Sequence, residues 1–114
     1  MFDSLTKDLI VTGRKTVTRR LRRDERKPAI PNTIHKLKID RTPKTYGFLY
    51  IISCEKGYLG SLTSYDALLE GFNSKREYLN YFNEVNNTAK YNTPIWIIRF
   101  KYLSNLEVTK NGNR

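Results

Sequence analysis

The residues best suited to chemistry lie near the start of the chain, in the segment "GRKTVTRR" from Gly13 to Arg20. Lys15 has arginines close to it in the sequence, and positive neighbours together with partial desolvation lower the pKa of a lysine. A neutral lysine amine can act as a general base or a nucleophile, and the hydroxyl of Thr18 becomes a nucleophile when such a base lies within hydrogen-bonding reach. Residues 15 and 18 face opposite sides of an unbroken strand. Their cooperation therefore requires Lys15 to lie at a bulge or in a turn before the strand, which Gly13 makes available.

Glu70 is the carboxylate most suited to join them, because it is expected to end a short helix just before Gly71. A carboxylate at the C-terminal end of a helix gains nothing from the helix dipole, which favours a role at the rim of a cleft. Simpler interpretations stay open for both charged residues. Lys15 also suits a phosphate contact, and Glu70 also suits a solvated position.

Basic residues are concentrated in the N-terminal part of the chain. The chain has 21 Lys and Arg against 11 Asp and Glu, a formal charge of +10, and residues 1–44 hold 13 of the basic residues and 5 of the acidic ones. Such a cluster attracts polyanions through counterion release, which favours RNA or DNA as partner ahead of an anionic membrane surface. The predicted nucleic-acid-binding residues are Arg14, Arg19, Arg20, Arg22, Arg23, Arg26 and Lys27.

Metal and thiol chemistry have little support in this composition. His35 and Cys54 are the single histidine and the single cysteine, so a zinc cluster or a Cys/His couple is not expected, and neither is a cofactor or an internal disulfide. No stretch approaches the roughly 20 apolar residues that span a bilayer, and no signal-peptide pattern opens the chain. We therefore expect a cytoplasmic protein without a membrane partner.

The hydrophobic pattern predicts a single small α+β domain over residues 1–104, built around a curled sheet. Expected helices lie within residues 2–13, 65–70 and 75–85, with N-caps at Asp3 or Ser4, at Thr63 or Ser64, and at Ser74. One expected strand begins at about Thr16, and three others cover residues 33–39, 46–54 and 95–103. Segment 46–54 is expected to be central and buried on both faces. A turn at 55–57 should add a hairpin strand at 58–63, while 22–32 should form a flexible basic loop and 105–114 a frayed tail.

Two segments resemble ASCH domains of the PUA-like superfamily. "GRKTVTRR" looks like the motif G-x-K-x-x-[E/T]-x-R, with Gly13, Lys15, Thr18 and Arg20 on its fixed positions. "LLEGFNSKREYLNYF", residues 68–82, is similar to the segment of many ASCH proteins in which an E-G-F-x-S turn precedes a helix. The resemblance runs from Phe2 to about residue 103 and implies a small PUA-like mixed β-barrel with short helices closing its ends. It also implies an RNA-related role, which in some members is ribonuclease activity.

One bacterial subgroup of this family is an amidohydrolase that removes the acetyl group from N4-acetylcytidine. Its motif G-[RK]-K-T-[IV]-T is matched here, and the resemblance implies a catalytic triad of Lys15, Thr18 and Glu70. In that scheme Lys15 removes the proton of Thr18, Thr18 attacks the acetyl carbonyl, and Glu70 helps to protonate the leaving amine and activate water. The basic loop departs from this picture, since a neutral nucleoside offers no phosphate to neutralise.

Three functional hypotheses follow. The first is an ASCH-type module that binds nucleic acid, most simply RNA, with or without hydrolytic activity such as RNA cleavage. The second is an amidohydrolase acting on acetylated cytidine, either as the free modified nucleoside or within RNA. The third is a non-catalytic interaction module with a basic surface. The choice between RNA and DNA, and the oligomeric state, stay open at this point.

Overall fold

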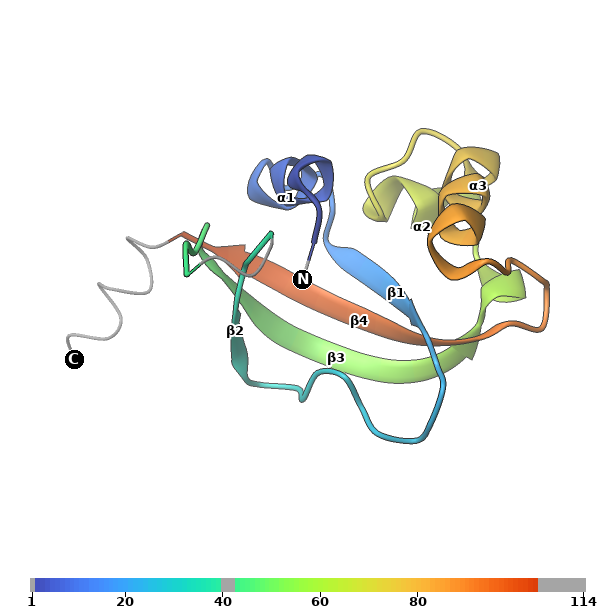
Figure 1. The fold of residues 1–114 in the computed structure, drawn as a ribbon, viewed down its shortest axis with the longest axis horizontal. Helices are drawn as coiled ribbons and strands as arrows, with labels where there is room; N and C mark the ends of the chain where they lie inside the picture. The colour runs from blue at the N-terminus through green and yellow to red at the C-terminus, as the bar shows by residue number, and fades with distance from the viewer. Residues whose placement is uncertain (1, 40–42, 105–114) are drawn as a thin grey trace.

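The computed structural model describes residues 2–39 and 43–104 of the chain. These residues form three α-helices, a short 3₁₀ helix and four strands (Figure 1). In chain order the elements are α1 (Ser4–Val11), β1 (Val17–Leu21), β2 (Ile34–Lys36), β3 (Phe48–Tyr58), η1 (Leu59–Ser61), α2 (Ser64–Leu69), α3 (Lys75–Asn86) and β4 (Pro94–Leu103). The predicted small α+β fold is confirmed. Within the described residues, no helix has the length and apolar character needed to cross a membrane.

The strands form one four-stranded sheet in the order β1-β4-β3-β2, and each described pairing is antiparallel. β4 lies inside the sheet because it carries apolar side chains on both faces. One face has Trp96, Ile98 and Phe100, as the alternation predicts, and the other has Ile95 and Ile97. β1 pairs only with β4 and is therefore an edge strand of this sheet.

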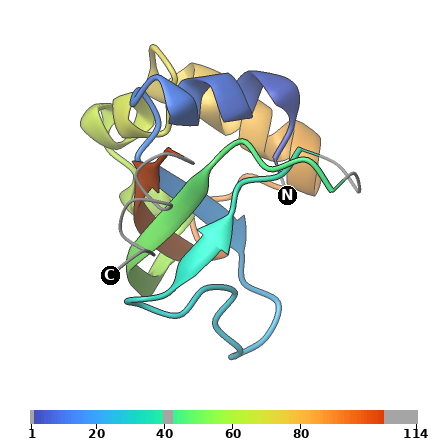
Figure 2. The same cartoon turned by 90° about the vertical axis from the view of Figure 1, so that its left-hand side faces the viewer.

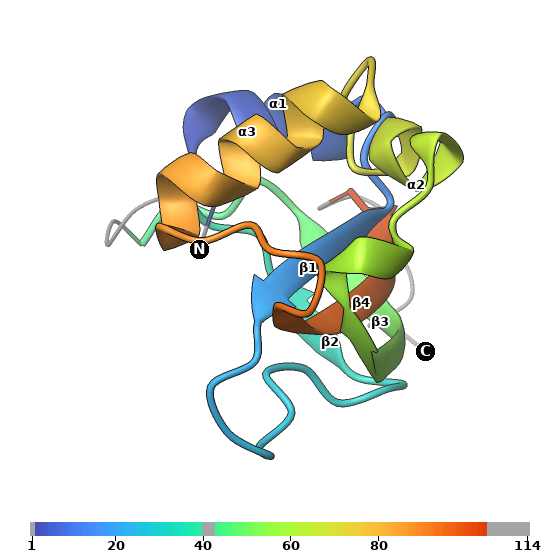
Figure 3. The same cartoon turned by 90° about the vertical axis from the view of Figure 1, so that its right-hand side faces the viewer.

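Two hydrophobic clusters lie on the two faces of β4. The first joins the end of α1 to the sheet and to the loop after β1, through Ile10, Ala29, Leu37, Leu49, Ile51, Cys54, Trp96, Ile98 and Phe100. The second packs α2 and α3 against the start of β4, through Leu59, Leu62, Ala67, Tyr78, Phe82 and Ile95. Figures 2 and 3 show the helices gathered across one side of the sheet, with the loop after β1 on the opposite side.

The predicted helix starts agree with the structure, because each has a side chain that satisfies free N–H groups of the first turn. Asp3 accepts a hydrogen bond from the Thr6 N–H, and Ser74 accepts one from the Glu77 N–H. Thr63 and Asp66 form a complete capping box at the start of α2. Capping residues thus locate these helices from the sequence alone.

The predicted hairpin is wrong. Residues 55–57 do not turn but continue β3, which pairs with β4 as far as Tyr58, opposite Pro94. The ten residues of β4 present a continuous edge of backbone hydrogen-bonding groups, and a β3 of matching length satisfies them. β3 is central, as predicted, but it alternates rather than being buried on both faces, because Ile52 is exposed. The strand expected at 33–39 is limited to β2, Ile34–Lys36.

The basic loop is attached to the sheet at both of its ends. The N–H of Arg22 donates to the carbonyl of Pro94 at 3.0 Å, and the N–H of Asn32 donates to the carbonyl of Ile51 at 2.8 Å. Ala29 is buried in the first cluster. The flexibility predicted for residues 22–32 stays a prediction. Because Arg22, Ala29 and Asn32 are attached to the sheet, such flexibility would be confined mainly to the segment between Arg22 and Ala29. The tail predicted at 105–114 lies outside the described residues.

We expect Gly71→Ala to destabilise the fold more than Gly13→Ala. Both glycines have positive φ, +93° and +82°, where an L side chain costs about 1–2 kcal/mol. A Cβ on Gly71 would also lie 2.9 Å from Leu9 Cδ1, whereas a Cβ on Gly13 meets no atom within 4 Å. Urea unfolding should therefore show an additional loss of about 1 kcal/mol or more for Gly71→Ala. Equal losses for the two variants would contradict the close contact between α1 and the turn after α2.

Candidate functional site

Lys15 is positioned by the turn between α1 and β1, not by the strand. Helix α1 ends at Val11, and Gly13 with its positive φ redirects the chain. The N–H of Lys15 then donates to the carbonyl of Leu9 at 3.0 Å, before β1 begins at Val17. Lys15 thus lies outside the alternation of the strand, which satisfies the geometric condition drawn from the sequence.

Glu70 reaches the same place from the end of α2. It is the C-cap of that helix, and its N–H donates to the carbonyl of Asp66 at 3.0 Å. The ammonium group of Lys15 forms an ion pair with Glu70 Oε1 and lies 3.4 Å from the backbone carbonyl oxygen of Glu70. The alternative of a solvated Glu70 is therefore wrong, because this carboxylate is buried and paired.

Arg19 completes this buried cluster. Its Nη1 donates to Glu70 Oε2 at 2.9 Å, so each carboxylate oxygen of Glu70 faces one cation. Its Nη2 lies 3.6 Å from Asp66 Oδ1. Burial alone would raise the pKa of Asp66, but hydrogen bonds from Thr63 and the charges of Arg19 and Arg99 lower it. The structure thus places Arg19 in the buried ion pair, so its guanidinium is not available on the surface as the predicted nucleic-acid-binding role requires.

The pKa of Lys15 is lowered, in the direction expected from the sequence. Burial of the ammonium group is the largest cause, and the charges of Arg20 and Arg19 add to it. The Glu70 carboxylate opposes the shift, through its charge and through its hydrogen bond to Lys15. A lowered pKa increases the fraction of neutral amine at a given pH, which is the form that can accept a proton.

Thr18 lies on β1 opposite Ile98 and lines a cavity of about 230 Å³ together with Lys15, Arg19 and Glu70. All four side chains are largely buried, with exposed fractions of 8% for Thr18, 5% for Lys15, 7% for Arg19 and 1% for Glu70. Within the described part of the chain, the Thr18 hydroxyl has no hydrogen bond to Lys15, whose ammonium group is paired with Glu70. The cavity therefore holds a hydroxyl, an amine of lowered pKa and a carboxylate, which are the groups that acyl transfer requires.

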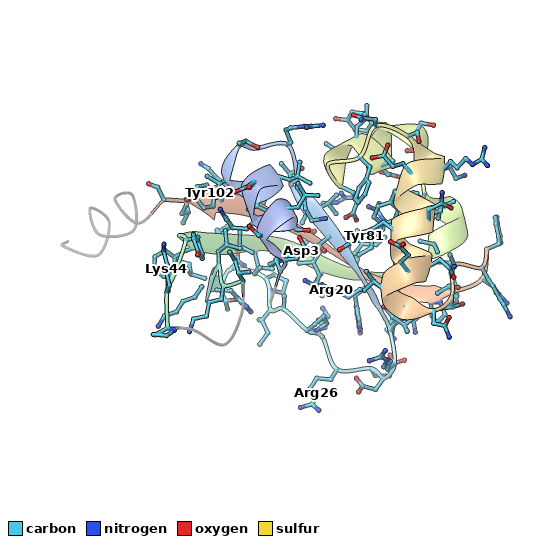
Figure 4. The ribbon with its side chains drawn as sticks, turned by 45° about the horizontal axis from the view of Figure 1, so that its top comes forward. Asp3, Arg20, Arg26, Lys44, Tyr81 and Tyr102 are labelled. Carbon is cyan, nitrogen blue, oxygen red and sulfur yellow. The ribbon has the colours of Figure 1, made fainter. Side chains whose placement is uncertain are left out.

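Helices α1 and α3 form the other walls of this cavity. Phe2, Asp3, Tyr81 and Asn86 line it, and the sequence pattern did not indicate a site role for any of them. Figure 4 shows Asp3, Arg20 and Tyr81 converging between α1 and α3, while Arg26 lies on the loop on the opposite side of the molecule. The residues missed from the sequence come from the segment that leads into α1 and from α3, whose relative position depends on the tertiary packing.

The remaining basic residues fall into two groups. Arg20 and Arg22 are half-buried, with the Arg20 guanidinium 4.8 Å from the Phe2 ring centre and that of Arg22 5.9 Å from the rings of Tyr58 and Trp96. The exposed group comprises Arg14, whose Nη2 donates to Asn73 Oδ1 at 3.5 Å, and Arg23, Arg26 and Lys27 on the loop. In residues 2–39 and 43–104, no three His, Cys, Asp or Glu side chains gather in a way that could hold a metal ion.

The fold and the cavity define a class of protein, a small α+β domain with a buried Lys–Glu–Arg cluster beside a cleft. No protein-family model matches the sequence, and no curated protein matches it. Several solved structures do match this chain in their fold. An ASCH domain from Lactobacillus crispatus JV V101 matches with a TM-score of 0.68 at 17% identity, covering 88% of this chain and 71% of the other.

Two further solved structures agree. ASCH from Zymomonas mobilis matches with a TM-score of 0.60 at 20% identity, covering 96% of this chain and 73% of the other. A DUF984 protein from Enterococcus faecalis V583 matches with a TM-score of 0.66 at 15% identity, covering 88% of this chain and 71% of the other. At such identities the similarity concerns the fold, and the predicted ASCH-type fold is confirmed.

We expect Glu70→Gln to destabilise the protein strongly, by about 3–5 kcal/mol, because it leaves two buried cations without their shared carboxylate. Lys15→Met should cost about half of that or less, since Glu70 keeps its pairing with Arg19. Urea unfolding would measure both losses. Glu84→Gln, on the exposed side of α3, is the matched control and should change stability by no more than about 0.5 kcal/mol. A Lys15→Met variant as unstable as Glu70→Gln would contradict the sharing of the carboxylate.

Proposed function

We propose that the chain is an ASCH-type RNA-binding domain that holds the phosphate backbone with the basic loop after β1. The observation that carries this proposal is the state of the loop charges. The carboxylate of Glu25 is paired with Lys56, and its Oε1 lies 3.6 Å from Arg22 Nη1. The carboxylate of Asp24 accepts a hydrogen bond from the backbone N–H of Arg26. The acidic residues of the loop are thus engaged locally.

Three basic side chains of the same loop have no such partners. Arg23, Arg26 and Lys27 are exposed and form no ion pair within the described residues. Cations that face water without a counter-charge bind phosphate by releasing its counterions. Arg23 also lines a cavity next to Thr18, so the loop connects a phosphate-binding surface to the candidate site.

A second candidate function, amidohydrolysis of N4-acetylcytidine, is favoured by a separate observation. Lys15, Thr18 and Glu70 line one cavity, although they come from a turn, a strand and a helix end. In the proposed reaction the Thr18 hydroxyl loses its proton to neutral Lys15, and its oxygen forms an ester bond with the acetyl carbon. The bond from the acetyl carbon to N4 breaks, and the proton passes to N4. Water then hydrolyses the ester, releasing acetate and restoring Thr18.

The contacts of Glu70 favour a positioning role in this scheme. Both of its carboxylate oxygens accept hydrogen bonds from cations, one from Lys15 and one from Arg19. A carboxylate held in this way fixes the amine of Lys15 at the cavity wall. Lys15 is then the group that exchanges protons with Thr18 and with the leaving nitrogen.

We expect binding of a single-stranded RNA of about ten nucleotides to weaken steeply with salt. The double variant Arg26→Gln/Lys27→Gln removes two phosphate contacts and should reduce the slope of log K against log salt by about 1.4. Fluorescence anisotropy at several salt concentrations measures this slope. Lys75→Gln/Arg76→Gln on α3 removes the same charge away from the loop and should leave the slope unchanged. The proposal fails if both double variants behave alike.

We expect deacetylation of N4-acetylcytidine, free or within RNA, to accelerate with pH and to level off below the ordinary pKa of lysine. The reason is that burial lowers the pKa of Lys15, and the neutral amine increases as the pH rises through that lowered value. Chromatography of the released cytidine measures the rate. Thr18→Val and Lys15→Met should each lose about a hundredfold or more, whereas Arg76→Gln should keep the full rate. Wild-type rates in Thr18→Val would exclude this second function.

A further inference from the structure

A second cavity adjoins the one that holds Lys15 and Glu70. We call the cavity of about 230 Å³ the inner cavity and its neighbour of about 470 Å³ the outer cavity. The two share Phe2, Thr18, Arg20 and Asn86 as lining residues. Thr18 and Arg20 are two residues apart on β1 and therefore face the same side of the strand. The two cavities thus adjoin along β1, and we call them together the cleft.

The outer cavity combines an apolar floor with a basic rim. Its floor is formed by side chains of the sheet, Leu49, Ile51, Ile98 and Phe100, and its rim carries Arg23, His35 and Lys36. Its volume lies within the range of small-ligand sites, about 300–1,000 Å³. A flat ring that can lie with one face on an apolar floor and that carries an attached anion has the matching chemistry, and a nucleotide is such a group.

Arg20 lies where the two cavities meet. Its guanidinium is 4.8 Å from the centre of the Phe2 ring, and it is half-buried. It forms no ion pair within the described residues, and the nearby carboxylate of Asp3 accepts a hydrogen bond from the Thr6 N–H as the cap of α1. A guanidinium oriented by stacking on an aromatic ring is well suited to bind phosphate through two hydrogen bonds.

We propose that the cleft binds two consecutive nucleotides of an RNA strand, with one base in the inner cavity beside Thr18 and the next in the outer cavity. The phosphodiester between them lies at Arg20. This inference rests on the proposed RNA binding and adds the ligand unit that the cleft recognises. Thr18 and Arg20 are separated by about 6.6 Å along the strand. This spacing separates the base beside Thr18 from the phosphate at Arg20. Two bases held in two separate cavities are splayed apart rather than stacked, as in single-strand recognition.

The test compares three probes on the full chain by isothermal titration calorimetry. They are 2′-O-methylcytidine, the 2′-O-methylated dinucleotide CpC, and a 2′-O-methylated RNA of about ten nucleotides. The methyl group prevents attack by the 2′-hydroxyl, so the probes stay intact during the titration. The dinucleotide should bind about tenfold or more tightly than the nucleoside, because it adds a charge-assisted phosphate contact and fills the outer cavity.

Single charge removals then locate the phosphate. Arg20→Gln should weaken dinucleotide binding about tenfold and nucleoside binding several-fold less, because the nucleoside has no phosphate for the guanidinium to bind. Arg23→Gln removes a charge from an exposed position on the rim of the outer cavity and should also weaken binding of the dinucleotide but not of the nucleoside. Because the contact with the Phe2 ring is made by Arg20, this second variant leaves that contact in place. Arg76→Gln is the matched control, since it removes an equal charge from an exposed position on α3 and should change neither affinity.

The outcomes separate this inference from the proposed function. If the longer RNA binds but the dinucleotide binds no more tightly than the nucleoside, the inference is wrong and the proposed function stands. If the longer RNA does not bind at all, the proposed function fails and the inference fails with it. If Arg76→Gln weakens dinucleotide binding as much as Arg20→Gln and Arg23→Gln do, net charge explains the effect and the phosphate position is wrong.

Discussion

The carboxylate of Glu70 is shared between two cations beneath the surface of the molecule, and this interaction organises the rest of the site. One oxygen faces Lys15 and the other faces Arg19, so the end of α2 is joined to the turn before β1 and to the strand itself. Two cations and one buried carboxylate leave an excess of positive charge, which Asp66 offsets from a less buried position. An arginine does not deprotonate in a protein, so the excess favours loss of the proton from Lys15. The contact that joins these backbone segments thus also leaves Lys15 as the paired cation that can lose its proton.

The edge position of β1 explains how one short strand serves both faces of the sheet. Thr18 and Arg20 face the cleft and the first hydrophobic cluster, whereas Arg19 points to the opposite side, where α2 ends at Glu70. An inner strand has a hydrogen-bonded neighbour on each side, so the sheet separates the side chains of its two faces. At an edge, side chains from both faces can reach one cavity. Helices α1 and α3 close that cavity from above the sheet (Figure 1).

Local signals were sufficient for much of the fold and indicated three residues, Lys15, Thr18 and Glu70, that line one cavity. Capping residues fixed the helix starts, alternation identified β4, and Gly13 allowed Lys15 to leave the strand. The hairpin at residues 55–57 was wrong because charged residues and a glycine suggest a turn, while the length of β4 demands a long partner. That demand is a tertiary effect, which no local window contains.

The site was predicted less completely than the fold, for a related reason. Alternation gives the two faces of β1 but does not say which of them is covered. The sequence therefore predicts nucleic-acid binding for Arg19, although its guanidinium is buried against Glu70 at the end of α2. Tyr81 and Asn86 follow the helical periodicity of α3 without any mark that separates a cavity wall from a core position. Only the packing of α3 beside α1 makes them part of the site.

The positive charges of the chain divide into two populations with different physical roles. Lys15 and Arg19 are buried and paired, so dissolved ions screen their interactions only slightly. The exposed loop carries Arg23, Arg26 and Lys27. At physiological ionic strength, salt largely screens the interactions of these charges beyond about 8 Å. Arg23 lines the outer cavity and brings the second population to the entrance of the cleft. The proposed attraction of a polyanion would therefore depend on ionic strength, whereas the lowered pKa of Lys15 depends on the burial and pairing that the fold imposes.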